Sequence, residues 1–331
     1  MKTCNILKRI KDRIPYSWLL LYEMWGYWRR LFKYNASFAT DDDMQKMQYT
    51  LLRENHVIEK GMSMRNPRKG FGQEKVSALI KRLRKYNTLY GNSDRSFLIY
   101  PLSTIKAYIK YQHEDAVNIP DIEDKFLNLC QEVGIDPNAL ITAAGVYTTD
   151  SGNLRRDAMG NFESLLYSRH SIRYFKEELP AKERIERALE LAARTPSACN
   201  RQAWHTHIYM GADSHRLLDM QGGCNGFADN IHCSIVVTAD MKGFLDYEPF
   251  QCYVDGGLYA MNLINTLHYE GLGTIPLSCG FYSTKLKMIQ KSFDIPDNEV
   301  MVVIIGCGEL TEEVKIAASS RKEVCKTNVF H

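Results

Sequence analysis

The sequence lacks several patterns that would point at once to a class of function. Its nine cysteines include no Cys-x-x-Cys pair and no paired Cys/His spacing, which argues against a zinc site. The 21 glycines form no dinucleotide-binding fingerprint, so we expect no dedicated dinucleotide-binding domain. The net charge is only +3 and no nucleic-acid motif accompanies it, which argues against a nucleic-acid partner.

The N-terminal part of the chain also lacks an uninterrupted apolar run. The aromatic-rich stretch from Trp18 to Phe32 contains Glu23, Arg29 and Arg30, so it is too interrupted to span a bilayer. The basic residues between Lys8 and Arg13 leave an interfacial membrane helix open, although packing of the aromatics on the helical region or across a dimer is favoured. No small-residue cleavage site marks a signal peptide, and the odd number of cysteines favours a reducing cytoplasm.

The first half of the chain predicts helices and carries no strong strand signal. The predicted helices cover Thr40 to Gly61, Gln73 to Tyr90, Leu102 to Gln112 and Ile122 to Val133. The first of them begins with three aspartates, as a helix N-terminus favours, and Gly61 is a suitable end. We therefore expect a helical N-terminal region over residues 1–150 and a second domain over residues 151–331.

The basic stretch and His56 of this helical region each allow two interpretations. Nine basic residues between Lys60 and Lys85 are opposed only by Glu74. A solvated helix face is the favoured interpretation, and a site for an anionic ligand is the alternative. His56 is favoured as an ordinary helix histidine, while the nearby Glu59 leaves a catalytic role open.

The second half opens with a segment rich in donors, Ser168 to Phe175. Arg169, Ser171 and Arg173 would point the same way if this segment is extended. Guanidinium and hydroxyl donors suit a phosphate and an electron-rich ring edge. A predicted helix from Pro180 to Arg194 follows this segment and stops before Pro196.

The remainder of the second half mixes strands with helices. Strands are predicted over His205 to Met210, Ser234 to Ala239 and Glu299 to Gly306, the last as a continuous apolar run. Between them, apolar residues from Val254 to Leu267 follow helical spacing, and Gly271 lies just past the end of that helix. The predicted class is therefore α+β.

The second half carries motifs in a fixed order, which are SRHSIRYF at 168–175, ARTPSACNRQAW at 193–204, YVDGGLYAMNL at 253–263 and GLGTIPLSCG at 271–280. In these ordered landmarks, the chain from about Phe162 to its end resembles the nitroreductase family of FMN-dependent oxidoreductases. This resemblance implies a sheet flanked by helices, in an interlocked homodimer whose two flavin sites lie at the subunit interface.

The resemblance also implies a set of flavin-binding residues. These are Arg169, His170, Ser171, Arg173, Pro196, Ser197, Asn200, Gln202, Pro276, Leu277, Ser278, Gly280, Ser320 and Arg321. Arg169 and Ser171 would contact the phosphate or ribityl chain, and Arg173 would stabilise negative charge at the N1/O2 edge. Asn200 would form a hydrogen bond with the ring, and the Pro276 to Gly280 loop would cover one ring face.

Several positions need separate comment. Ser320 and Arg321 match the tail position of the family that reaches the phosphate. The chain departs from the family pattern at Ala203, where proline is usual, and at Ser319, where a basic residue is frequent. Cys199 and Cys279 fall beside predicted flavin contacts and are expected to be small buried residues.

The resemblance implies an FMN-dependent oxidoreductase with NADH or NADPH as a transient donor. The acceptor would be a nitro compound, a quinone or a specialised small molecule, with an anionic molecule as one option. No amino-acid nucleophile or metal is required. Two alternatives stay open. One is a flavin-binding scaffold or regulator whose helical half binds a partner or membrane, and the other is a substrate dehydrogenase of the same family.

Overall fold

The computed structural model describes residues 43–140, 144–244 and 248–331, together with Trp18, Leu21, Met24, Trp25 and Trp28. Its contacts divide these residues into two compact units. The helical unit comprises the described residues of Met1–Tyr147 together with Ala317–His331, and the sheet unit is formed by Thr148–Ile316. The final residues, which we expected to belong to the second domain, are therefore grouped with the helices.

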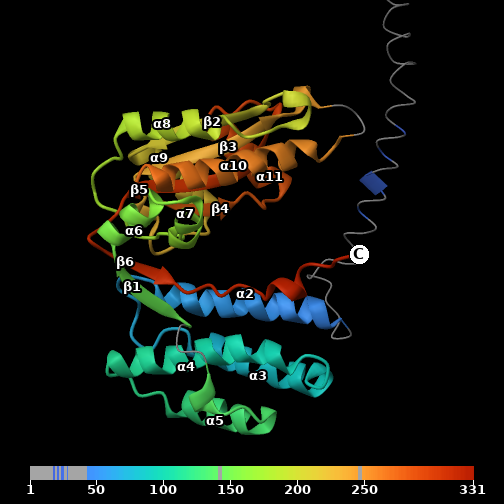
Figure 1. Cartoon of the computed structure of the whole chain (residues 1–331), viewed down its shortest axis with the longest axis vertical. Helices are drawn as coiled ribbons and strands as arrows, with labels where there is room; N and C mark the ends of the chain where they lie inside the picture. The colour runs from blue at the N-terminus through green and yellow to red at the C-terminus, as the bar shows by residue number, and fades with distance from the viewer. Residues whose placement is uncertain are drawn as a thin grey trace, which may run out of the picture. The chain divides into compact units, whose positions relative to one another are not determined.

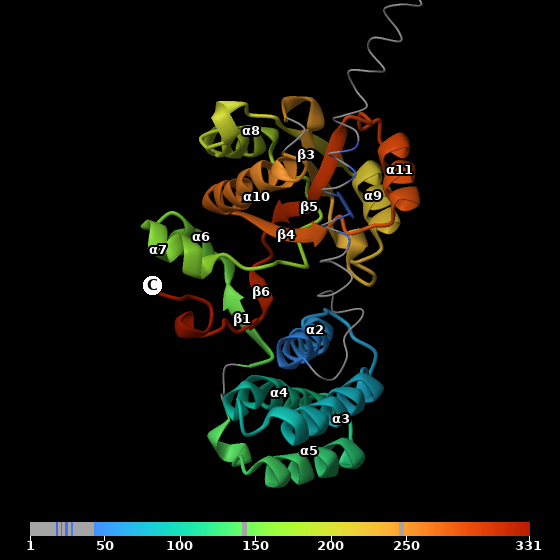
Figure 2. The same cartoon turned by 90° about the vertical axis from the view of Figure 1, so that its right-hand side faces the viewer.

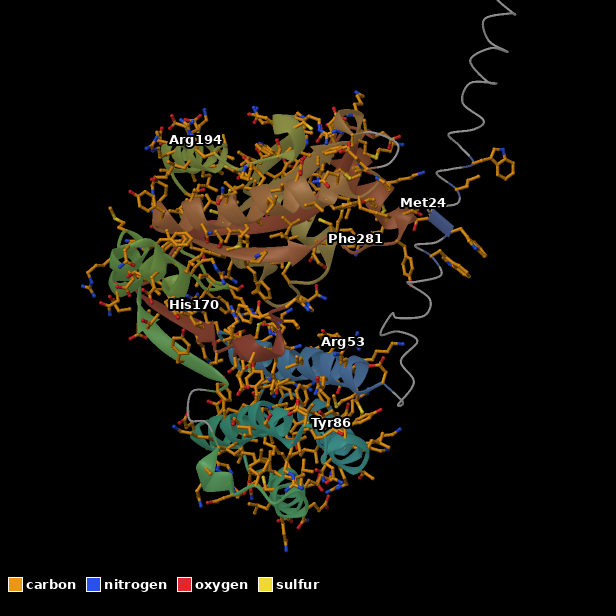
Figure 3. All side chains as sticks on the ribbon, turned by 45° about the vertical axis from the view of Figure 1, so that its right-hand side comes forward. Met24, Arg53, Tyr86, His170, Arg194 and Phe281 are labelled. Atoms are coloured by element: carbon orange, nitrogen blue, oxygen red, sulfur yellow. The ribbon has the colours of Figure 1, made fainter. Side chains whose placement is uncertain are left out.

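In the described part of the helical unit, four helices pack around one apolar core (Figure 1, blue to green). They are α2 (Met44–Met62), α3 (Gln73–Tyr90), α4 (Ile99–Glu114) and α5 (Pro120–Val133). Each contributes one apolar face, and the core includes the fully buried side chains of Leu51, Leu79, Leu102 and Leu129. Tyr86, labelled in Figure 3, is also fully buried in this unit.

The helices predicted from the sequence are confirmed, with shifts at their ends. α3 has the predicted limits. α2 begins after Asp43, whose side chain accepts a hydrogen bond from the Lys46 amide at 3.0 Å. Gly61 does not end α2, because it lies inside the helix, where an added Cβ would collide with the ring of Phe71. The glycine therefore permits close packing at this point.

The sheet unit is centred on an antiparallel four-stranded sheet with the order β2-β3-β5-β4. Its strands are β2 (Trp204–Met210), β3 (Cys233–Asp240), β4 (Leu272–Ser278) and β5 (Glu299–Glu309). A separate two-stranded sheet pairs β1 (Val146–Asp150) with β6 (Glu313–Ala317). The three strands predicted from the sequence are confirmed as β2, β3 and β5, and β4 was not predicted as a strand.

Helices cover both faces of the four-stranded sheet, as Figure 2 shows. α8 (Lys182–Ala192) and α10 (Gln251–Tyr269) pack on one face, where Ile235, Val237 and Ile305 join them in a buried cluster. α9 (Ala212–Gln221) and α11 (Ser283–Ser292) cover the other face. Two short helices, α6 (Ser151–Ala158) and α7 (Phe162–Ser168), lead into this unit. The predicted α+β class, with a sheet flanked by helices after a helical region, is confirmed.

The structure corrects the expected loop from Pro276 to Gly280. Pro276, Leu277 and Ser278 complete β4, and the loop begins only at Cys279. β4 is an edge strand, where a proline is tolerated because one side of the strand needs no ladder hydrogen bond. The predicted flavin-covering loop is thus partly a strand.

The described residues of the N-terminal stretch lie in helix and are exposed. Trp18 is 68% exposed, and Trp25 and Trp28 stack with ring centroids 4.9 Å apart while remaining 57% and 50% exposed. Packing of these aromatics on the helical region or across a dimer stays a prediction. The remaining residues of the stretch, including the basic ones from Lys8 to Arg13, lie outside the described part of the chain. Within the described part, no helix combines the length and apolar character needed to cross a membrane.

Candidate functional site

The donor-rich segment that follows α7 runs beside the edge strand β4. Ser171 forms a parallel bridge with Thr274, and the amide of Ile172 donates to the Thr274 carbonyl at 2.8 Å. Arg169 and Ser171 are partly exposed there. Arg173 is only 4% exposed, so its side chain is less accessible to a ligand than those of Arg169 and Ser171. Its predicted contact with the flavin edge stays a prediction.

A buried pair lies at the start of this segment. The Oγ of Ser168 and the Nε2 of His268 are 2.8 Å apart, and His268 belongs to α10, which packs on the same face of the sheet as α8. Burial, followed by the charges of Arg169 and His170, lowers the pKa of His268 to about 4. The imidazole is therefore neutral at pH 7 and serves as a hydrogen-bond partner. Sequence analysis missed this residue, because helical spacing alone marks it as one more buried position of α10.

The second predicted motif forms a turn between α8 and β2. Three of its residues that are not glycine have positive φ, which are Cys199 at 51°, Asn200 at 53° and Gln202 at 50°. The left-handed conformation costs about 1–2 kcal/mol for a residue with a side chain, and Asn tolerates it best. The side chains of Asn200 and Gln202 are exposed. Backbone strain of this kind clusters at functional sites and persists only where the surroundings fix it.

Neighbouring side chains fix this turn from several directions. The Oγ of Ser197 accepts from the amide of Gln202 at 2.9 Å, and Oδ2 of Asp255 accepts from the amide of Ala198 at 3.1 Å. Arg201 makes a two-pronged contact with Glu248 at 2.7 and 2.8 Å. The predicted role of Ser197 in shaping the turn thus has a visible basis. Asp255 was not predicted, because its partner lies 57 positions earlier in the chain.

The end of β4 offers few side chains. Pro276, Ser278 and Gly280 are exposed, and Leu277 is buried. Burial raises the pKa of Cys279 to about 12, so this cysteine is a thiol at neutral pH. Cys199 is exposed, contrary to the expectation of a small buried residue, because the left-handed turn directs it away from the core.

The predicted flavin residues of the sheet unit fall into two groups. The β4 group is Arg169–Arg173 with Pro276–Gly280, and the β2 group is the turn Pro196–Gln202. β2 and β4 are opposite edges of the sheet and are separated by three strand spacings, or about 14 Å. In Figure 3, His170 of the β4 group and Arg194, shortly before the turn, lie on separate sides of this unit. One chain therefore does not bring both groups to a single place.

With this geometry in view, residues 166–225 match the family model described as the Nitroreductase family. The chain contains a nitroreductase-family segment. This segment includes Arg169–Arg173 and Pro196–Gln202, so both groups of the sheet unit are represented in it. The resemblance seen in the sequence is thereby confirmed.

Similar proteins and structures each align with about half of the chain. A protein from Archaeoglobus fulgidus, provisionally named an NADH dehydrogenase/NAD(P)H nitroreductase, is 26% identical over 150 residues, covering 45% of this chain and 85% of that protein. An FMN-dependent nitroreductase from Clostridium difficile aligns at 22% identity over 45% of this chain and 87% of its own, with a TM-score of 0.40. A provisionally named nitroreductase in complex with FMN from Exiguobacterium sibiricum aligns at 18% identity over 52% and 98%, with a TM-score of 0.46.

Two predicted flavin residues lie outside the nitroreductase-family segment and outside the sheet unit. The tail that carries Ser320 and Arg321 is grouped with the helical unit, where the Ser320 amide donates to the hydroxyl of Tyr100 at 3.2 Å. That hydroxyl donates in turn to the buried carboxylate of Glu59 at 2.8 Å. Both tail residues line a cavity of about 530 Å³ together with residues of α2 and α4. A role of Ser320 and Arg321 in phosphate binding stays a prediction.

The basic stretch of the helical unit is partly neutralised by its neighbours. Arg82 contacts Glu54 of α2 at 3.0 Å, and Arg84 contacts Glu132 of α5 at 2.6 Å. These ion pairs favour the interpretation as a solvated helix face. His56 is exposed on α2. In the part of the chain that the structure describes, no group of three or more His, Cys, Asp or Glu side chains is placed to hold a metal ion.

Proposed function

We propose that this chain is an FMN-dependent oxidoreductase that uses NADH or NADPH as donor. The observation that carries the proposal is that the nitroreductase-family segment contains Arg169–Arg173 of the β4 group and the whole β2 group, Pro196–Gln202. The name of the A. fulgidus relative also joins a nicotinamide donor to nitro-group reduction. The proposed acceptor is a nitro compound, a quinone or a more specialised small molecule.

The residues present fit the flavin. Arg169 and Ser171 are partly exposed and offer charged and hydroxyl donors for the phosphate end, while Asn200 and Gln202 offer exposed amides for the polar edge of the ring. When bound, FMN would supply hydride transfer at its N5 atom, and the protein would supply orientation and electrostatics. The buried Arg173 would stabilise negative charge at the N1/O2 edge from behind the segment.

We further propose that two chains complete each site. The β4 group and the β2 group occupy opposite edges of one sheet, and we propose that a ligand held by both groups takes the second group from another copy. α10 presents a suitable surface for this assembly, because Val254, Leu258 and Met261 lie one turn apart and are 51%, 48% and 44% exposed. Gly257 lies on the same stripe, and a Cβ placed there would meet nothing within 4 Å.

The reducing cytoplasm is the proposed location. All cysteines that the structure describes are free thiols, which agrees with that compartment.

Turnover distinguishes an enzyme from a flavin-binding scaffold. Purified protein loaded with FMN would be mixed with NADH or NADPH, with and without a quinone or nitroaromatic acceptor. We expect donor oxidation to accelerate several-fold when the acceptor is present, because reduced flavin must be reoxidised before the next donor reacts. Slow donor oxidation that ignores the acceptor would contradict the enzyme and favour the scaffold.

A further inference from the structure

The carboxylate of Asp255 is almost completely enclosed behind the turn that carries Asn200. Asp255 lies in the N-terminal part of α10 and is 1% exposed. Its Oδ2 accepts from the backbone amide of Ala198 at 3.1 Å, and its Oδ1 accepts from Nε2 of Gln251 at 2.8 Å. Enclosing a carboxylate is costly unless hydrogen bonds compensate for the lost water, and both oxygens have such a bond here.

The amide that Asp255 holds belongs to the residue directly before the left-handed part of the turn. Cys199 and Asn200 follow Ala198, with φ of 51° and 53°. An amide bonded to a carboxylate is held more strongly than one bonded to a neutral acceptor. Fixing the Ala198 amide therefore fixes the backbone orientation of the residue that directly precedes the left-handed residues Cys199 and Asn200.

The other contacts of the turn do not replace this one. Ser197 closes the turn from its own side chain, through the amide of Gln202. Arg201 joins Glu248 and donates from Nε to the Ala198 carbonyl at 2.9 Å. These bonds connect the turn to itself and to a neighbouring loop, whereas Asp255 ties it to α10, which packs on the sheet.

We propose that Asp255 is a positioning residue that holds the Pro196–Gln202 turn in its left-handed conformation and so sets the affinity of the protein for FMN. The inference rests on the proposed function, since it concerns the turn assigned to the flavin ring. Asp255 is buried and contacts the turn, so its proposed effect on FMN acts through the turn. If the turn adopts the competent conformation only a fraction of the time, the apparent Kd rises by the inverse of that fraction.

The test uses the full chain and five variants, with FMN affinity measured by titration of flavin fluorescence. Asp255→Ala removes both acceptor oxygens, and we expect its Kd for FMN to rise about tenfold or more. This rise corresponds to a tenth or less of the molecules holding the turn in its competent conformation. Asp255→Asn keeps one acceptor oxygen for the Ala198 amide, so we expect a smaller loss. Ser214→Ala is the matched control, because Ser214 is also buried and hydrogen-bonded, to Ser234 at 2.7 Å, but packs between α9 and β3.

Cys199→Gly separates positioning from a general loss of stability. Glycine adopts positive φ without steric cost. In the Asp255→Ala background, we expect Cys199→Gly to lower the Kd about threefold or more relative to the change that the same substitution causes in the wild-type background. A merely structural role would give no such recovery. An equal effect of Cys199→Gly in both backgrounds would overturn the inference.

Hydrogen exchange in the absence of FMN provides a readout that does not depend on the ligand. We expect the peptide containing residues 197–203 to exchange about tenfold faster in Asp255→Ala and to keep its wild-type rate in Ser214→Ala. If wild-type protein binds no FMN, the proposed function fails and the flavin part of this inference fails with it. If wild type binds FMN and Asp255→Ala binds it equally well with unchanged exchange, only the inference about Asp255 fails.

Discussion

Ser168 and His268 are 100 positions apart in the chain, and their Oγ and Nε2 atoms lie 2.8 Å apart inside the sheet unit. Both residues are buried, Ser168 at the end of α7 and His268 near the end of α10. The hydrogen bond ties these two helices together immediately before Arg169. It therefore fixes the point at which the donor-rich segment begins its course beside β4.

The stability of the sheet unit should depend on pH through His268. Its pKa is lowered from 6.5 to about 4 in the folded protein by burial, Arg169 and His170. Between these two values the unfolded chain binds more protons than the folded one, so stability is complete above pH 6.5 and is lost as the pH falls toward 4. The loss attributable to this residue is about 3 kcal/mol over that window.

Urea unfolding of wild type and His268→Gln measures this contribution. Glutamine retains an amide that can reach Ser168 but has no group that titrates in this range. From pH 7 to pH 5 we expect wild type to lose about 2 kcal/mol more than the variant. Parallel losses in the two proteins would show that His268 does not titrate as the structure requires.

Arg169 should contribute directly to FMN affinity. It is partly exposed beside Ser171, where its guanidinium can meet a phosphate. A hydrogen bond to a charged group contributes about 1.5–3 kcal/mol, so Arg169→Ala should weaken FMN binding by about tenfold or more. Arg187→Ala is the control, since Arg187 lies exposed on α8 and contacts Glu190. The assignment of Arg169 would be wrong if both variants bound FMN as wild type does.

Assembly into a dimer should be sensitive to Gly257. Nothing lies within 4 Å of a Cβ at this position, so Gly257→Arg is accommodated in the single chain but places a charge on the exposed stripe of α10. We expect the variant to be monomeric by light scattering and to lose FMN binding as well, because each site needs two chains. Thr88→Arg adds the same charge to an exposed position of α3 and should leave the dimer intact. A monomeric wild-type protein, or a dimeric Gly257→Arg, would exclude α10 as the proposed interface.

The C-terminal tail should depend on Tyr100 for its attachment to the helical unit. Tyr100→Phe removes the hydroxyl that contacts both Glu59 and the Ser320 amide, at 2.8 and 3.2 Å. We expect a loss of about 1–3 kcal/mol in the stability of this unit and faster proteolysis of the tail, because a buried carboxylate loses a donor. Lys326→Ala breaks the more exposed contacts with Asp94 and Ser96 and should cost less than about 1 kcal/mol. Unchanged stability and proteolysis of Tyr100→Phe would contradict the described packing.

Elements with a strong local pattern were predictable from the sequence. The limits of α3 follow from its own residues, and a continuous apolar run predicts β5. β4 was missed because Gly273 and Pro276 weaken a strand pattern. Its tolerance of both residues depends on its place at the sheet edge and on the close packing of Leu310 against Gly273, which only the folded chain reveals.

The candidate site divides in the same way. The hydrogen-bond donors at Arg169, Ser171 and Asn200 were predictable from the sequence because a ligand-binding motif is local in sequence. The residues that hold those motifs, His268 and Asp255, act across 100 and 57 positions and have no local signature. The separation of the motifs onto β4 and β2 likewise follows from strand order, which alternation of residues does not encode.

The most direct test of the account is the visible spectrum of the purified protein before and after a nicotinamide donor is added without oxygen. We predict the two absorption bands of oxidised flavin, at one FMN for each chain, and their bleaching by NADH or NADPH. A colourless protein that takes up no added FMN, or a bound flavin that neither donor reduces, would contradict the central claim.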